Sequence, residues 1–273
     1  MLNAIRWAVF ALAAFAMNFP LIVTLVTSFK SAREISTNPG LWINAPTLEN
    51  YATVLTVSDR LNIFLYLANS FAVAAMGTLL AVALALPAAY AIVRGRFGEK
   101  TLLPLIVNLR AVPLVIFAIP IYMMFQFMGL LDTRLGLGLV MTIVNIPLVL
   151  IILVNAISDV PFELDEAAMI DGVSRTGILF KIVGPVCRPA LVTSMIFGFI
   201  TAWNEFLFGL MLTTSKAVPV TVGASFFFAA SGGGVQWGVA AAVMMVGALP
   251  PMLLGLVMYR KISGTMMAGA VKG

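Results

Sequence analysis

The sequence of 273 residues contains no histidine and a single cysteine, Cys187. Without histidine the chain cannot form a Ser-His-Asp triad, a Cys-His pair or a histidine metal site. One cysteine excludes an internal disulfide and a cysteine-rich zinc site. We therefore expect no metal site and no cofactor bound by this chain.

Charged residues are also scarce. They make up 10% of the chain, while 62% of the residues are hydrophobic. A soluble globular chain is usually about 25% charged and about 45–50% apolar. This composition excludes an ordinary water-soluble enzyme, and the high hydrophobicity excludes a disordered chain. A polytopic membrane protein is the class that remains.

Long stretches without charge mark the predicted membrane helices. A bilayer core of about 30 Å needs roughly 20 apolar residues of helix. The stretch at 189–215 holds only one acid, Glu205, and the charge-free stretch at 217–259 is long enough for a loop and one helix. The sequence predicts an all-α protein, a single transmembrane domain over residues 1–273, with spans at about 7–29, 65–93, 102–128, 136–157, 190–212 and 237–259.

The distribution of Lys and Arg predicts the orientation. Ten of the sixteen lie in segments that face the cytoplasm if the N-terminus is inside, five lie outside, and Arg110 lies within a span. Because cytoplasmic loops carry the excess of positive charge, we expect both termini in the cytoplasm. The net charge of +5 follows this topology, so the expected surroundings are membrane lipid and not nucleic acid.

One loop, residues 158–189, differs from everything around it, because it holds five of the eleven acidic residues. Pro161 suits a first helical turn, and Gly172 suits a helix end. Ser174 can cap a second helix, which we expect to end at Pro185. The pattern predicts two short helices that project from the membrane.

Two alanines in this loop, Ala167 and Ala168, are expected on its exposed face, where small side chains let a partner approach closely. The alternative for the loop is a solvated linker or a helix on the membrane surface.

The loop resembles a known motif. Glu166-Ala167-Ala168, three residues, Gly172, nine residues and then Ile182-Val183-Gly184-Pro185 are similar to the EAA loop of membrane subunits of ATP-binding-cassette (ABC) importers. The pattern of that loop ends in I-x-L-P, and Gly184 stands here in place of the Leu.

Other segments resemble one branch of these subunits, the permeases for carbohydrates and related polyols. The similar segments are Pro46–Tyr51, Gly129–Thr133, Ala202–Phe206 and the tail Gly269-Ala270-Val271-Lys272-Gly273. Together with the loop they are distributed over nearly the whole length of the chain.

The resemblance implies a type I ABC importer permease fold with a cytoplasmic EAA coupling loop, in a bacterial cytoplasmic (inner) membrane. It implies four kinds of partner: a second permease subunit in a heterodimer, two cytoplasmic ATPases, an external solute-binding protein, and membrane lipid. The function implied is ATP-driven uptake of a sugar, oligosaccharide or polyol. The residues that match the ATPase-coupling turn are Glu166, Ala167, Ala168, Asp171 and Gly172. The tail at 269–273 resembles a segment that reaches the ATPase dimer interface in the maltose system.

The chain itself has no nucleotide-binding motif. Residues 95–101 end in Lys-Thr, but they lack the spacing of a phosphate-binding loop and follow a hydrophobic span. We therefore expect no enzyme activity from this chain, and we expect ATP and Mg²⁺ on the partner ATPase.

Polar side chains within spans are the candidates for the substrate pathway. Ionisable residues are costly in a membrane and usually face a cavity or the bundle interior. Glu205 and Arg110 meet this description and are expected to line one pathway, and a pair between them is a further hypothesis. Aromatic faces and hydrogen-bonding groups suit sugars; the further candidates are Trp203, Asn204, Asn145 and Tyr122.

Three alternatives stand beside the importer. An ion-gradient-driven secondary transporter of a small polar solute would show inverted repeats and midplane acids, and we find no convincing repeat. A membrane enzyme would need a catalytic constellation that these residues do not form. A scaffolding subunit would need no ATPase-docking turn. The EAA-like loop favours the importer over all three.

Overall fold

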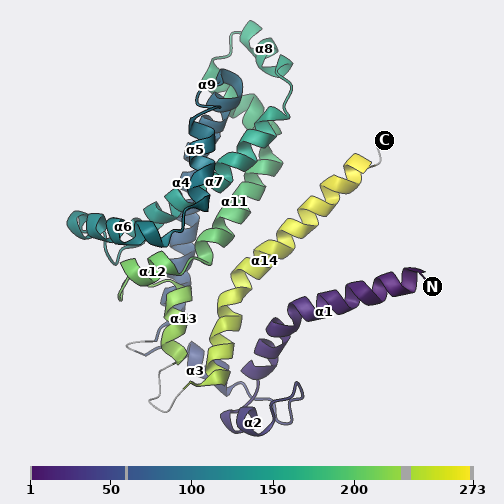
Figure 1. Ribbon diagram of the computed structural model, residues 1–273, viewed down its shortest axis with the longest axis vertical. Coiled ribbons are helices and arrows are strands. Elements are labelled where there is room, and N and C mark those ends of the chain that lie inside the picture. Colours follow the sequence, from purple (N-terminus) through teal and green to yellow (C-terminus); the bar gives the residue numbers. More distant parts are fainter. Residues whose placement is uncertain (1, 59–60, 229–234, 271–273) are drawn as a thin grey trace. The chain divides into compact units, whose positions relative to one another are not determined.

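The computed structural model describes residues 2–58, 61–228 and 235–270, and it describes the side chains of residues 5–256 within those ranges. Regular structure in these ranges is helical, as predicted. The elements, labelled in Figure 1 where there is room, are α1 (Leu2–Ser28), α2 (Ala32–Thr37), α3 (Glu49–Leu55), α4 (Ile63–Gly95), α5 (Leu102–Asn108), the 3-10 turn η1 (Leu109–Ala111), α6 (Val115–Met128), α7 (Arg134–Ser158), α8 (Glu163–Ile170), α9 (Arg175–Ile178), the π-helical turn η2 (Leu179–Val183), α10 (Gly184–Val186), α11 (Arg188–Trp203), α12 (Leu207–Leu212), α13 (Val220–Phe228) and α14 (Trp237–Ala270).

Four helices in the described ranges are long and apolar enough to cross a membrane. They are Ile5–Ser28, Ile63–Gly95, Arg134–Ser158 and Trp237–Leu256. Two bent helix pairs raise the number to six if each pair is one span. The predicted number of six agrees with the larger number. One bent pair, Leu102–Ala111 with Val115–Met128, matches the predicted span at 102–128. The other, Arg175–Val186 with Arg188–Trp203, is bent by 80° and includes part of the predicted loop at 158–189 in place of the end of the predicted span at 190–212.

The predicted span at 102–128 is broken. Helix α5 with η1 and helix α6 meet at an angle of 103°. The break lies at Pro113, which has no backbone N–H to donate. The residue before it, Val112, is extended with φ −79° and ψ 126°, as steric contact with a following proline favours. This proline lies at the point where the span divides into two segments of different direction, whereas Pro87, Pro120 and Pro147 lie inside the continuous helices α4, α6 and α7.

The predicted span at 190–212 is also interrupted. Helix α11 ends at Trp203, and α12 begins at Leu207. The charge-free stretch at 217–259 holds more than a loop and one helix, because α13 precedes α14. Helix α14 also runs on past the predicted end at residue 259 to Ala270.

The chain divides into two units. One contains residues 1–67 and 220–250, and the other contains residues 68–219 and 251–273. In the first unit the segment after α1 is held by buried polar side chains. Lys30 is 3% exposed and donates to the carbonyl oxygens of Asn38 and Gly40, while Asn50 donates to those of Ser28 and Lys30.

The core of the second unit joins α4, α7 and the loop after α7. Small side chains at four-residue spacing, Ala81, Ala85 and Ala89, form the face of α4 within this core. They allow close helix contact in a membrane. At Gly77 a Cβ atom would lie 2.5 Å from Cβ of Met141, so α4 approaches α7 too closely there for a larger residue. This close pair of helices carries the polar sites described below.

Candidate functional site

The loop after α7 folds as local chemistry directs. Helix α8 begins soon after Pro161 with three acidic residues in its first turn, where negative charge suits the positive end of the helix dipole. It ends at Ile170, and Gly172 follows two residues later with a φ of +78°, the left-handed conformation that glycine adopts readily. The N–H of Gly172 donates to the carbonyl of Met169 at 3.0 Å. The predicted end of the first loop helix is therefore confirmed.

The second loop helix begins as predicted but ends differently. The Ser174 hydroxyl accepts a hydrogen bond from the N–H of Gly177 at 3.2 Å and so caps α9. The expectation that Pro185 ends this helix is wrong. The chain passes through the π-helical turn η2, in which the N–H of Gly184 donates to the carbonyl of Leu179. Pro185 then lies in the first turn of α10, which needs no N–H from it.

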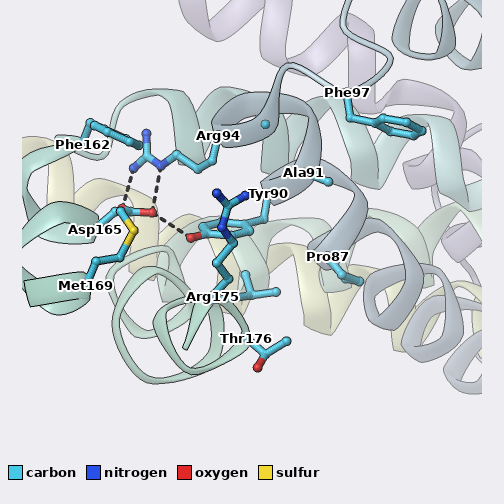
Figure 2. A pocket seen from close by; sticks show the side chains of 12 residues that line it. Pro87, Tyr90, Ala91, Arg94, Phe97, Phe162, Asp165, Met169, Arg175 and Thr176 are labelled. Atoms are coloured by element: carbon cyan, nitrogen blue, oxygen red, sulfur yellow. Dashed lines mark hydrogen bonds and ion pairs between the residues drawn. The ribbon is translucent and has the colours of Figure 1, made fainter. Parts of the chain in front are cut away.

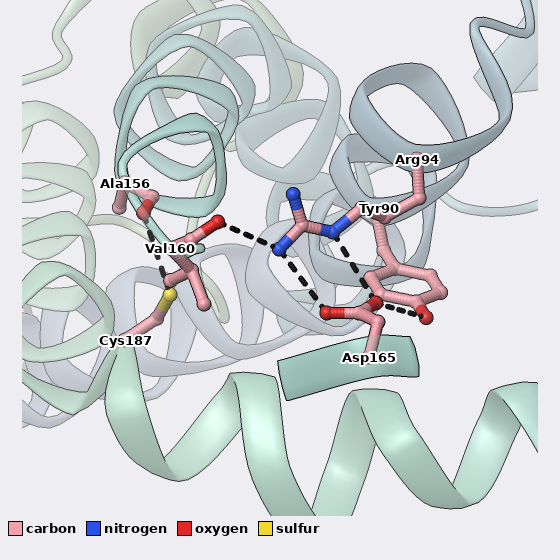
Figure 3. A network of polar contacts seen from close by, with 6 residues as sticks. All are labelled: Tyr90, Arg94, Ala156, Val160, Asp165 and Cys187. Atoms are coloured by element: carbon pink, nitrogen blue, oxygen red, sulfur yellow. Dashed lines mark hydrogen bonds and ion pairs between the residues drawn. The ribbon is translucent and has the colours of Figure 1, made fainter. Parts of the chain in front are cut away.

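Asp165 anchors α8 to the end of α4. Its side chain is 1% exposed. One carboxylate oxygen, Oδ1, lies 3.2 Å from Nη2 of Arg94, and the other accepts from Nε of Arg94 at 3.2 Å. The Tyr90 hydroxyl donates to the second oxygen at 2.8 Å. Figure 3 shows the three side chains converging, two from α4 and one from α8.

Arg94 makes two further contacts with the same loop. Its Nη2 donates to the carbonyl of Val160 at 2.9 Å, and its guanidinium lies 5.4 Å from the ring centroid of Phe162. The Arg94 side chain is only 11% exposed. A buried ion pair is stable when further hydrogen bonds satisfy both partners, as they do here. We refer to Tyr90, Arg94 and Asp165 as the α4–α8 clamp.

A cavity of about 470 Å³ borders the clamp. Figure 2 shows its lining, which includes Pro87, Tyr90 and Arg94 of α4, Phe162 and Met169 around α8, and Arg175 of α9. Side chains therefore do not fill the space between the end of α4 and α9. Two kinds of contact hold α8 in place: the clamp, and the packing of Ala168 in the core.

Four of the five predicted docking residues are exposed: Glu166, Ala167, Asp171 and Gly172. Ala168 is 4% exposed and packs within this chain, so the expectation that both alanines lie on the exposed face is wrong for Ala168. The sequence reading did not single out Asp165. A signal was present, because Asp165 and Ala168 are three residues apart and therefore share one face of α8.

Two of the predicted pathway residues, Asn145 and Trp203, are buried, whereas the other four are partly or fully exposed. Asn145 of α7 is fully buried, and its Nδ2 donates to the carbonyl of Gly198 in α11 at 3.1 Å. Trp203 ends α11, is 3% exposed and stacks on Phe199 with ring centroids 5.6 Å apart. Because α7 and α11 are in contact, Asn145 of α7 binds the same helix, α11, that carries Trp203.

The break after α11 gives Glu205 a structural role. Both of its carboxylate oxygens accept from the N–H of Phe208 at 3.1 Å, and one accepts from Gly209 at 3.3 Å. Asn204, beside it, is exposed. Arg110 and Tyr122 are exposed on η1 and α6. A pair between Arg110 and Glu205 stays a prediction.

The predicted ATPase-contacting tail lies at the limit of the described chain. Gly269 and Ala270 end α14. Val271, Lys272 and Gly273 lie outside the described residues.

The fold defines the class of protein. A solved bacterial ABC transporter involved in the import of the acidic polysaccharide alginate has a chain of the same fold, with a TM-score of 0.77 and 20% sequence identity over 95% of both chains. The apolar helices, the two bent pairs and this likeness define a polytopic helical chain with the fold of that ABC transporter chain.

Sequence comparison then gives the family. Residues 77–264 match the binding-protein-dependent transport system inner membrane component family, and the chain belongs to it. The sulfoquinovosyl glycerol transport permease SmoH of Agrobacterium fabrum is 34% identical, covering 93% of this chain and 89% of the relative. The trehalose/maltose transport permease MalG of Thermococcus litoralis is also 34% identical, covering 93% and 91%. The inner membrane ABC transporter permease YcjP of Escherichia coli is 31% identical, covering 93% and 91%.

Family membership supports the importer over the ion-gradient alternative. The chain is a permease component of an ABC import system in the inner membrane, and such a component is not an enzyme by itself. The family implies a substrate-binding protein and an ATPase as partners.

Proposed function

We propose that this permease takes up a sugar, oligosaccharide or polyol that an external solute-binding protein delivers. Two of the three named relatives are transport permeases for sulfoquinovosyl glycerol and for trehalose or maltose, which are glycosides. In this proposal the chain forms half of the pathway, a second permease forms the other half, and two cytoplasmic ATPases bind ATP and Mg²⁺. The loop from α8 to α10 and both termini face the cytoplasm.

The observation that carries the proposal is that α8 and the turn after it have one side buried within this chain and one side exposed. Asp165 and Ala168 face inward and fasten the helix to α4, while Glu166, Ala167, Asp171 and Gly172 stay exposed. A helix held rigidly on one side with acidic and small residues on the other suits a docking surface for a protein partner. Movement of that partner reaches α4 through the clamp.

Reconstitution tests this function. The chain is expressed with its partner permease, ATPase and binding protein and assayed in liposomes for uptake and for ATP hydrolysis with and without loaded binding protein. We expect loaded binding protein to raise hydrolysis, and Glu166→Ala to reduce that rise. Asp159→Asn is the control, because Asp159 is an exposed acid just outside α8. A chain that neither binds an ATPase nor changes its activity would overturn the proposal and favour the ion-gradient transporter.

Substrate contacts are proposed for Trp203, Asn204, Glu205, Asn145, Tyr122 and Arg110. Among the side chains that the structure describes, Asn145 Oδ1 is one of two buried polar atoms without a hydrogen-bond partner, the other being Thr78 Oγ1. A buried acceptor of this kind calls for an explanation, and a substrate hydroxyl or a water molecule in the pathway is a suitable donor. This supports placing Asn145 beside the pathway.

The pairing of Arg110 with Glu205 is tested by charge reversal. If the two interact during transport, Arg110→Glu combined with Glu205→Arg restores uptake better than either single change. Because Glu205 also binds the backbone of α12, we expect only partial recovery. A double variant that transports no better than both single variants rules out the pair.

The subunit composition is proposed from the family resemblance and is tested directly. Native mass spectrometry of the purified complex should give one copy of this chain, one partner permease and two ATPase subunits. Two copies of this chain in a complex without another permease would replace the heterodimer by a homodimer.

A further inference from the structure

A second polar network holds the segment between α12 and α13. Asp132, in the turn between α6 and α7, accepts hydrogen bonds from the backbone N–H groups of Thr214, Ser215, Lys216 and Ala217, at distances of 3.0 to 3.2 Å. The hydroxyls of Thr214 and Ser215 also donate to Asp132, at 3.1 and 3.0 Å. One carboxylate therefore takes up four successive N–H groups. We refer to residues 213–218 as the held loop.

Asn69 binds the carbonyl side of the same loop. Its side chain is fully buried, and its Nδ2 donates to the carbonyls of Lys216 at 3.0 Å and Val218 at 2.9 Å. Its Oδ1 accepts from Nε of Arg134 at 2.7 Å. The held loop is thus bonded to α4 through Asn69, which in turn binds Arg134 at the start of α7. Asp132 bonds the loop to the turn between α6 and α7.

The two polar networks lie at opposite ends of the same two helices. Asn69 lies near the start of α4, and Tyr90 and Arg94 lie near its end. The 25 residues from Asn69 to Arg94 correspond to about 37 Å of helix at 1.5 Å per residue. Arg134 begins α7, and Val160, a partner of Arg94, lies just after its end. The held loop and the coupling loop therefore face opposite sides of the membrane that α4 and α7 cross.

The bonds to the held loop exceed what an ordinary surface loop needs. Thr213, Ala217 and Val218 are buried, but Thr214, Ser215 and Lys216 are exposed, so water could satisfy the backbone groups of these three. Instead, side chains bind four N–H groups and two carbonyls of the loop. A loop bound in this way must follow Asn69 when α4 moves.

This inference rests on the proposed function. We infer that Asn69 and Asp132 are positioning residues that fasten the held loop to α4 and α7, so that movement imposed on α4 at the clamp displaces the held loop on the opposite face. In this arrangement α4 links the ATPase side of the membrane to the side on which substrate arrives. Neither residue needs to touch the substrate.

Labelling at position 216 tests the inference in the complete transporter. The Lys216 side chain is exposed and only its backbone groups make the bonds described, so Lys216→Cys leaves the network in place. The natural Cys187 is buried. A membrane-impermeant maleimide reports the labelling rate without nucleotide and after trapping with ATP and vanadate. In the variant that carries Lys216→Cys and no further substitution, we expect these two labelling rates to differ.

The added substitution Asn69→Ala should abolish this nucleotide-dependent difference, and Asp132→Asn, a milder change, should reduce it. Asn155→Ala is the matched control, since it removes an exposed amide from α7 and should leave the difference intact. A difference that persists in both Asn69→Ala and Asp132→Asn, or that is absent in Lys216→Cys alone while ATP drives uptake, overturns the inference. Failure of the unaltered complex to couple ATP hydrolysis to uptake would instead overturn the proposed function.

Discussion

Arg94 and Asp165 are 71 residues apart in the chain, yet the guanidinium and the carboxylate meet through two contacts of 3.2 Å. Asp165 belongs to the loop that resembles an ATPase-docking motif, and Arg94 directly follows the second predicted span and lies in the last turn of α4. The pair therefore connects the loop to a membrane helix by charge as well as by packing.

Removing one partner of this pair should destabilise the protein strongly. Breaking a buried ion pair costs about 3–5 kcal/mol, because the remaining charge is left buried. We expect Asp165→Ala to lower the free energy of unfolding by about 3 kcal/mol, since Val160 still binds the remaining Arg94. Thermal unfolding of the purified protein in detergent measures this. Glu163→Gln, at an exposed acid of the same helix, should change stability by less than about 0.5 kcal/mol.

Exchanging the two charges tests whether the pair itself matters. Arg94→Asp with Asp165→Arg should be more stable than either single change but less stable than the natural protein. Recovery is incomplete because an aspartate at position 94 cannot donate to the carbonyl of Val160. A double variant no more stable than the single variants would show that the charges do not act as a pair.

The hydroxyl of Tyr90 should contribute less than the ion pair. Tyr90→Phe removes one donor to Asp165, and a hydrogen bond to a charged group is worth about 1.5–3 kcal/mol. In an Asp165→Ala background the same change should have little effect, because the acceptor is already absent. Equal losses in both backgrounds would mean that Tyr90 acts through packing alone. Unfolding of the four variants completes this double-mutant cycle.

Gly172 separates backbone strain from contact with a partner. A Cβ atom at this position meets nothing within 4 Å in this chain, so Gly172→Ala should cost only the strain of the left-handed conformation, about 1 kcal/mol. Gly172→Asn should cost less, since asparagine tolerates this conformation. If the ATPase covers this turn, both changes reduce hydrolysis stimulated by loaded binding protein far more than they reduce thermal stability. If Gly172→Asn keeps normal stimulation of ATP hydrolysis by loaded binding protein, Gly172 serves only to form the turn and not to contact the ATPase.

Local chemistry made much of the coupling loop predictable. The glycine that ends α8 and the serine that caps α9 act on residues one to three positions away. The buried position of Asp165 was not predictable in the same way. An acidic residue in a polar loop is expected to be solvated unless its partner, here Arg94, is known. The position of Asp165 on the inner face of α8 was readable, but its partner was not.

The broken spans show the same limit. A proline within a span favours a kink, but nothing in the sequence near Pro113 sets the angle of 103° between the two segments. Glu205 was readable as a costly acid within a span, whereas its bonds to the first N–H groups of α12 require knowing that α11 ends before it. Helix α13 was not predicted, because a stretch without charged residues does not show where one helix ends and the next begins.

The held loop should make stability depend on pH through Asp132. Burial alone raises the pKa of Asp132, but the N–H groups of Lys216, Thr214, Ala217 and Ser215 point at the carboxylate and lower the pKa well below its usual range. A lowered folded-state pKa stabilises the protein at every pH above the unfolded-state value, about 4. That stabilisation is lost as the pH falls from there toward the folded-state pKa.

Comparing the natural protein with Asp132→Asn isolates this contribution. We expect the natural protein to be more stable by about 2 kcal/mol near neutral pH, because the charge-assisted bonds weaken in the variant. The gap in unfolding temperature should stay constant from about pH 8 to pH 5 and shrink below about pH 4. Glu49→Gln, which removes an exposed carboxylate outside the network, should show neither the gap nor its pH dependence. A gap that stays constant down to pH 3 would mean that the shape of the Asp132 side chain, and not its charge, holds the loop.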